Sequence, residues 1–144
     1  MSAFQFTLER VMRWRTVELA REQSKLETLI QNQIRIQQQI AALGEERTKL
    51  PSISAFPDLR GQDFRAAAAY GLRLKRQLTN LEQLSGKCQR ELAAQRKKYN
   101  EAKQRVRLLE ELKTRQLSRW QYEQNLQMEA LASESYLASW GRGR

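Results

Sequence analysis

The amino-acid sequence predicts an all-α fold: a single antiparallel two-helix coiled-coil domain whose second helix is longer than its first. Three observations support this prediction. The 144 residues contain only six glycines and two prolines, and residues that favour long helices dominate. Apolar residues recur at alternating steps of four and three along two long segments. The two prolines lie close together between those segments, where the chain can reverse.

The first helix is expected over residues 4–50. Ser2 or Thr7 can cap it, and Gln5 stands three residues after Ser2, as in a capping box. The polar residues that interrupt its apolar stripe are Arg15, Glu22, Gln33 and Arg47. The stripe itself consists of Leu8, Met12, Leu19, Leu26, Leu29, Ile36, Ile40, Leu43 and Leu50. A stripe of this period lies on one side of a helix and needs a partner to cover it.

The turn between the helices is expected at residues 51–60. Pro51 and Pro57 each push the preceding residue out of helical geometry, so neither helix can continue through this segment. Asp58 or Asp63 can cap the helix that follows. A connector of this length allows the second helix to fold back along the first.

The second helix is expected over residues 61–139. Its seam positions follow the same four-three rhythm and are Gly71, Leu74, Leu78, Leu81, Ser85, Cys88, Leu92, Gln95, Tyr99, Ala102, Val106 and Leu109. Only Gly71, Ser85 and Gln95 depart from the apolar pattern. A period near 3.5 residues sustained this far predicts a coiled-coil seam.

The two predicted helices have unequal lengths. If the turn is centred near Phe56, Leu50 lies beside Gln62 and Leu8 lies near Gln104. The second helix then extends past the start of the first by about thirty residues, or roughly 45 Å. Apolar residues are scattered around this extension: Leu117, Trp120, Tyr122, Leu126, Met128, Leu131, Tyr136, Leu137 and Trp140. An unpaired helix with such a surface is expected to bind a partner.

Catalytic, metal and cofactor sites are not expected. Histidine is absent, which removes the commonest general base and metal ligand. Cys88 is the single cysteine and falls on the seam, so we interpret it as a small buried hydrophobe. The first ten residues lack the apolar core of a signal peptide, and no stretch approaches the ~20 apolar residues of a membrane span. A non-enzymatic, cytoplasmic protein is therefore expected.

The net charge is +10, which favours acidic partners such as nucleic acid, anionic lipid headgroups or an acidic protein surface. The densest cationic stretch comprises Arg73, Lys75, Arg76, Lys87, Arg90, Arg96, Lys97, Lys98, Lys103, Arg105 and Arg107. It can be a solvated coiled-coil face, a docking surface for an acidic protein, or a nucleic-acid-binding surface. Aromatic stacking residues do not interleave with these charges, so we do not expect nucleic acid as a partner.

A second cluster of Arg10, Arg13, Trp14 and Arg15 lies near the start of the first helix. Trp14 falls beside the seam, and two interpretations are open. It can pack on the second helix near residues 97–101, or it can face a partner, since Trp and Arg often dominate interface energetics.

Three segments carry a resemblance to a known family. Residues 4–15, FQFTLERVMRWR, show an aromatic-x-aromatic-x-Leu pattern followed by a short apolar pair and an arginine. This pattern resembles the opening of the flagellar FliJ family. Residues 108–115, LLEELKTR, are similar to the second-helix segment of that family. Residues 124–138 are similar to its C-terminal region, although Ser133 and Glu134 stand where an acidic pair is more usual.

The resemblance spans nearly the whole chain and implies a small component of the flagellar type III protein export apparatus. The family is similar to the rotor stalk of rotary ATPases. Its members insert into the pore of the hexameric export ATPase, touch the cytoplasmic domain of the export gate and help handle export chaperones. The resemblance therefore implies a monomer that associates peripherally with the cytoplasmic face of the inner membrane, through the export apparatus.

Two sets of binding residues follow from this resemblance. The residues expected to contact the ATPase ring are Arg10, Arg13, Trp14, Trp120, Tyr122 and Leu126. The gate-facing region falls just after the turn, where Leu74, Leu78 and Leu81 are needed for the seam, which leaves Tyr70, Arg73 and Gln77 for the gate. Three alternatives stay open: the equivalent stalk of a virulence-type injectisome, a coiled coil that binds nucleic acid, and a dimerising structural rod.

Overall fold

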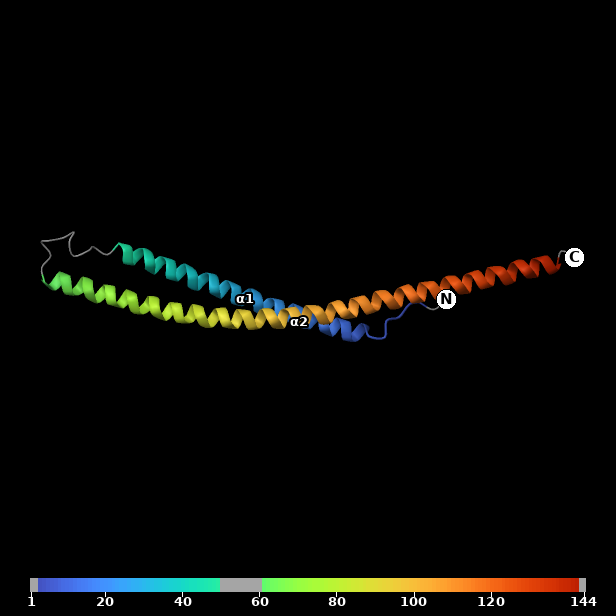
Figure 1. Ribbon diagram of the computed structural model, residues 1–144, viewed down its shortest axis with the longest axis horizontal. Helices are drawn as coiled ribbons and strands as arrows, with labels where there is room; N and C mark the ends of the chain where they lie inside the picture. The colour runs from blue at the N-terminus through green and yellow to red at the C-terminus, as the bar shows by residue number, and fades with distance from the viewer. Residues whose placement is uncertain (1–2, 50–60, 143–144) are drawn as a thin grey trace. The chain divides into compact units, whose positions relative to one another are not determined.

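The computed structural model describes residues 3–49 and 61–142 (Figure 1). Within them the chain forms helix α1, Glu9–Thr48, and helix α2, Gly61–Arg142, with no strand. The helices have 40 and 82 residues, so the prediction of an all-α hairpin with a longer second helix is confirmed. The expected turn at residues 51–60 lies outside the described residues.

Contacts divide the chain into two compact units. The terminal unit combines Met1–Ala20 with Glu101–Arg144, and the central unit is Arg21–Asn100. Both helices contribute to each unit. No helix in the described ranges is long and apolar enough to cross a membrane.

Helix α1 begins at Glu9, later than the predicted start near residue 4. The Leu8 carbonyl accepts a hydrogen bond from the Met12 N–H at 2.9 Å, so Leu8 and not Thr7 occupies the N-cap position. The Glu9 N–H donates to the Phe6 carbonyl at 3.1 Å. The Glu9 carboxylate lies in the first turn, where it complements the helix dipole.

The non-helical start of the chain packs in the terminal unit. Phe6 is buried, with 7% of its surface exposed, and the Phe4 ring centroid lies 6.0 Å from that of Trp120. An extended backbone advances about 3.3 Å per residue, more than twice the rise of a helix, so this segment can reach farther along α2. These aromatic contacts explain why the first helix starts later than its sequence suggests.

Helix α2 spans Gly61–Arg142, so it continues beyond the predicted end near residue 139. Asp63 lies inside the first turn instead of capping it. In that position its carboxylate complements the positive end of the helix dipole.

The two helices run antiparallel through the central unit, where Figure 1 shows them side by side. Near one end, the Tyr70 hydroxyl donates to Glu46 Oε2 at 3.1 Å. Near the other, the Gln95 side chain donates to the Glu22 carbonyl at 3.1 Å. Residue numbers therefore rise along α2 as they fall along α1.

The predicted seam is the buried face of α2. Every predicted position from Gly71 to Leu109 is buried or half-buried, and Leu74 and Ala102 are only 3% and 2% exposed. On α1, every predicted stripe position from Leu8 to Leu43 is half-buried, including its three polar members in that range. Arg47 is exposed, and Leu50 lies outside the described residues.

The predicted pairing register was wrong by several residues. Leu8 was expected near Gln104, but the neighbouring Glu9 pairs with Lys113, whose Nζ lies 3.0 Å from Glu9 Oε2. Proline positions mark where a helix stops but do not determine which residues face each other, so they could not supply the register. The unpaired part of α2 is consequently shorter than about thirty residues.

Candidate partner-binding surfaces

Three predicted binding residues lie on the first two turns of α1. Arg10, Arg13 and Trp14 are all exposed, and Trp14 exposes 58% of its surface. The guanidinium carbon of Arg15 lies 4.6 Å from the Trp14 ring centroid, a cation–π contact that covers one face of the indole. The large exposed area favours the interpretation that Trp14 faces a partner.

A cationic groove of about 480 Å³ lies beside this cluster in the terminal unit. Its charged lining residues are Arg10, Arg13, Lys113 and Glu9. Glu9 pairs closely with Lys113 and more loosely with Arg13, whose Nε lies 3.9 Å from Glu9 Oε1. Because the Arg13 side chain is 78% exposed, its ion pair contributes little to stability. The groove therefore keeps an excess of positive charge.

Trp120 does not have the free surface that the sequence analysis expected. It is half-buried and its ring lies against Phe4 with an interplanar angle of 54°. By contrast, Tyr122 and Leu126 are 64% and 46% exposed. The structure thus assigns Trp120 an internal packing role and leaves Tyr122 and Leu126 accessible. The sequence pattern could not separate them, because only the position of Phe4 decides which aromatic is covered.

The exposed end of α2, residues 125–142, has no half-buried residue. Its large apolar side chains, each between 46% and 67% exposed, are Leu126, Met128, Leu131, Tyr136, Leu137 and Trp140. The Trp140 Nε1–H donates to the Tyr136 hydroxyl oxygen at 2.9 Å, which is a contact within the segment itself. This much exposed apolar surface is unusual and is typical of an interaction site.

The apolar side chains of the exposed end lie on opposite sides of the helix. Met128 and Leu137 are nine positions apart in the sequence, and so are Leu131 and Trp140. Nine residues correspond to about two and a half helical turns, which places the members of each pair on opposite sides. One partner helix covers one side only. A partner that encloses the helix would bury both sides.

The residues predicted to face the export gate lie in the central unit. Tyr70 is 43% exposed, and Arg73 and Gln77 are also exposed. The hydrogen bond from the Tyr70 hydroxyl to Glu46, together with the nearby carboxylate charge, raises the pKa of Tyr70, and Arg73 opposes this shift. Leu74 is buried in the seam, as the sequence analysis expected.

A groove of about 440 Å³ adjoins Gln77 and crosses both helices. It is lined by Gln39, Ala42, Leu43, Gln77, Asn80 and Leu81. The α1 half of this groove was not predicted, because the predicted register was wrong. The correct register could have been predicted by matching the polar residues of one stripe with those of the other.

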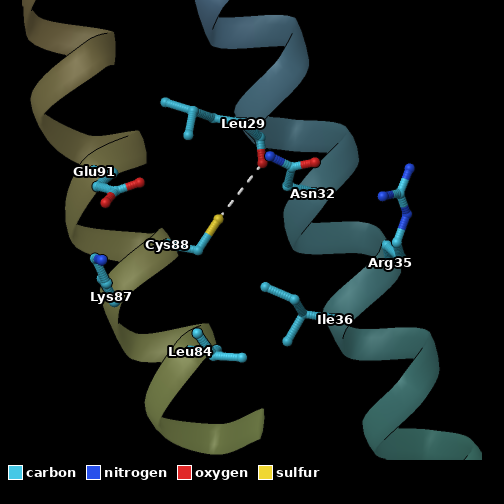
Figure 2. A pocket seen from close by; sticks show the side chains of 8 residues that line it. All are labelled: Leu29, Asn32, Arg35, Ile36, Leu84, Lys87, Cys88 and Glu91. Carbon is cyan, nitrogen blue, oxygen red and sulfur yellow. Dashed lines mark hydrogen bonds between the residues drawn. The ribbon is translucent and has the colours of Figure 1, made fainter.

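Cys88 lies in a second groove of the central unit, of about 310 Å³ (Figure 2). Its thiol points toward α1, with Sγ 3.6 Å from the Leu29 carbonyl oxygen, and only 7% of the residue is exposed. Figure 2 shows Leu29 and Ile36 reaching in from α1, while Arg35 extends away from α2. Cys88 is therefore buried at the seam, as predicted.

The cationic stretch of α2 is exposed at all eleven positions from Arg73 to Arg107. Arg105 lies 3.4 Å from Glu18, and Arg107 lies 3.7 Å from Glu111. The other nine cations form no ion pair with any residue in the described ranges. Their charge is available to an acidic partner.

No cluster of three or more His, Cys, Asp or Glu residues that could hold a metal ion occurs among the described residues. The surfaces found are suited to binding other macromolecules. Comparisons of the chain with known protein families, with curated proteins and with solved structures found no match.

Proposed function

We propose that this chain is a stalk and coupling protein of the flagellar type III export apparatus, similar to the FliJ family. In this role it links the hexameric export ATPase to the export gate at the cytoplasmic face of the inner membrane and assists export chaperones. The observation that carries the proposal is the exposed end of α2, with apolar side chains on opposite sides of one helix. The resemblance of residues 4–15 to the opening of that family supports the same assignment.

A helix inside a ring is surrounded by subunits, so side chains on opposite sides can be buried together. Met128 and Leu137 are 53% and 67% exposed and lie on opposite sides of α2. Full burial of a side chain of this kind contributes about 1.5–3 kcal/mol. An enclosing partner therefore gains more from this segment than a flat or one-sided partner does.

The two other surfaces have separate roles in this proposal. Trp14 and its neighbouring arginines on α1 contact the ATPase ring near the exposed end, as the family resemblance implies. Tyr70, Arg73 and Gln77 contact the gate. The exposed cations of α2 speed association with acidic surfaces, since complementary charge raises association rates more than it raises affinity.

The test is stimulation of the purified export ATPase by the wild-type chain and by a truncation that ends at Gln124. Every described residue that the truncation removes is exposed, and Trp120 is kept with its Phe4 contact. The helical circular dichroism per residue and the thermal midpoint should therefore change little. We expect stimulation by the wild-type chain and loss of most of it on truncation.

A matched control is Arg73→Ala, which lies on the gate-facing surface. This variant should stimulate the ATPase as the wild type does and should bind the cytoplasmic gate domain more weakly. Equal stimulation by the wild type and the truncation would remove the exposed end from the mechanism. Sedimentation velocity on the same samples checks the expected monomer.

A second candidate function is nucleic-acid binding, which is favoured by the nine cations of α2 that form no ion pair within the described ranges. Binding to duplex DNA that falls steeply between low and moderate salt would support it. In that case the truncation ending at Gln124 should bind DNA as well as the wild type, because the cations remain. Absence of DNA binding at low salt excludes this candidate.

A further inference from the structure

Two polar layers interrupt the apolar seam of the central unit. In the first, the side-chain amides of Gln33 and Gln37 donate to the Ser85 hydroxyl oxygen at 3.0 and 2.9 Å. In the second, the Gln95 amide donates to both the main-chain carbonyl and the carboxylate of Glu22. Ser85 and Gln95 are only 6% and 7% exposed. The polar interruptions of one stripe therefore meet the polar interruptions of the other.

The hydrogen bonds of both layers form in the same register. Ser85 and Gln95 stand ten residues apart on α2, and Gln33 and Glu22 stand eleven apart on α1. If α1 slipped by one heptad, Ser85 would face Ile40 and Gln95 would face Leu29. A slip in the other direction would place Ser85 against Leu26 and Glu22 against Cys88.

The apolar residues of the seam do not distinguish these registers well. A heptad slip brings leucine and isoleucine positions opposite other apolar positions, because the stripe repeats every seven residues. The polar groups do distinguish them. Each buried polar group that loses its hydrogen bond shifts the equilibrium between registers by roughly tenfold.

Stability alone does not account for the layer at Ser85. The Gln33 Oε1 atom is buried and has no hydrogen-bond partner among the described residues. A partly satisfied polar group in a seam is commonly less stabilising than an apolar side chain of the same size. A polar residue at a seam position is instead a known device for selecting one register.

We infer that the Gln33–Gln37–Ser85 and Glu22–Gln95 layers form a register lock that prevents α1 and α2 from sliding past each other by a heptad. This role is independent of the proposed function. The lock makes the central unit suitable for transmitting displacement, because a helix pair that slips cannot pass a movement of one helix to the other.

The test uses the single native cysteine as a reporter of register. A Leu29→Cys variant places a second thiol beside Cys88, since the Leu29 carbonyl oxygen lies 3.6 Å from Cys88 Sγ. An Ile36→Cys variant places it seven residues away, about 10 Å farther along α1, where only a slipped helix can form the disulfide. Both reporters are placed in the native seam and in a seam with Glu22→Leu, Gln95→Leu, Gln33→Leu and Ser85→Ala.

In the native seam we expect the Leu29→Cys disulfide to form and the Ile36→Cys disulfide to stay at background. In the apolar seam the first should decrease and the second should rise at least tenfold, while the thermal midpoint stays the same or increases. A volume-conserving seam change, Leu78→Met, is the matched control and should leave both yields unaltered.

The inference fails if the apolar seam still gives only the Leu29→Cys disulfide. Variants that remove one layer at a time give the same readout if the fourfold variant loses its helical circular dichroism. Each should raise the slipped product above its background in the native seam. Unchanged yields in both single-layer variants would also overturn the inference.

Discussion

Two stretches of α2 are both rich in apolar residues and have opposite surroundings. Between Gly71 and Leu109, every seam position is buried or half-buried against a partner. Between residues 125 and 142, every residue is exposed. The difference lies in the spacing: apolar residues of the first stretch follow a four-three rhythm, and those of the second point to opposite sides. Periodicity therefore indicates whether a helix has an internal partner, and apolar content by itself does not.

The polar residues of the two stretches also differ in burial. Ser85 and Gln95 interrupt the paired stretch, and both are buried with hydrogen-bond partners on α1. In the exposed end, Ser133 and Glu134 are simply exposed. A polar residue at a seam position thus indicates which residue of the other helix it faces. A polar residue in an unpaired helix gives no such indication.

Shortening one leucine in each stretch should change the free energy of unfolding very differently. Leu74 is 3% exposed, so Leu74→Ala should lower the free energy of unfolding by about 2–4 kcal/mol. Leu131 is 64% exposed, so Leu131→Ala should change it by less than about 0.5 kcal/mol. Denaturant unfolding followed by circular dichroism measures both changes. Comparable losses in the two variants would contradict the assignment of the exposed end as unpaired.

A smaller loss of stability is expected when the contact between the N-terminal segment and α2 is removed. Phe4→Ala removes the aromatic contact with Trp120, which should cost about 1 kcal/mol and expose the indole to water. The measurement is the emission maximum of Trp120 in a background with Trp14→Phe and Trp140→Phe. We expect a shift to longer wavelength.

A useful control is Tyr122→Ala, which shortens an exposed aromatic side chain near Trp120 in sequence. It should leave the Trp120 emission maximum close to its original position. If Phe4→Ala also leaves the emission unchanged, Phe4 does not cover Trp120 in solution.

The smallest effect concerns the pKa of Tyr70. Its ordinary value is 10.0, and the hydrogen bond to Glu46 raises it. A raised pKa means that folding favours the protonated phenol, so this contribution to stability is present below pH 10 and is lost as pH rises through the raised pKa. Glu46→Gln removes the carboxylate charge and should bring the pKa back toward 10.0.

Ultraviolet titration at the phenolate band measures this pKa in a background where Tyr99, Tyr122 and Tyr136 are replaced by Phe. Glu45→Gln is the matched control, because it removes a neighbouring carboxylate that does not bond to Tyr70. A larger decrease in the control than in Glu46→Gln would contradict the pairing of Tyr70 with Glu46.

The seam could be predicted position by position, but the register could not be predicted from the turn. The prolines mark where α1 and α2 stop and start, and many pairings fit between those limits. Matching Ser85 to Gln33 and Gln95 to Glu22 would have given the observed register, because one alignment satisfies both pairs. The α1 half of the groove beside Gln77 would then have been predicted too.

The start of α1 and the environment of Trp120 depend on one long-range contact. Residues 4–8 have no strong local reason to leave the helix, and Trp120 lies in a continuous helical sequence. The burial of Phe6 and the contact of Phe4 with Trp120 decide both features. A contact between residues so far apart in sequence leaves no periodic signal in either segment.

The helical class, the two buried stripes and the excess length of α2 could be predicted from the sequence alone, because each follows from a local repeat along the chain. Where α1 begins and how much of α2 stays uncovered became clear only from the folded molecule. Those features depend on side chains that meet across the seam. For the same reason, the exposed end of α2 is defined by the absence of an internal partner within the described residues, and not by its composition.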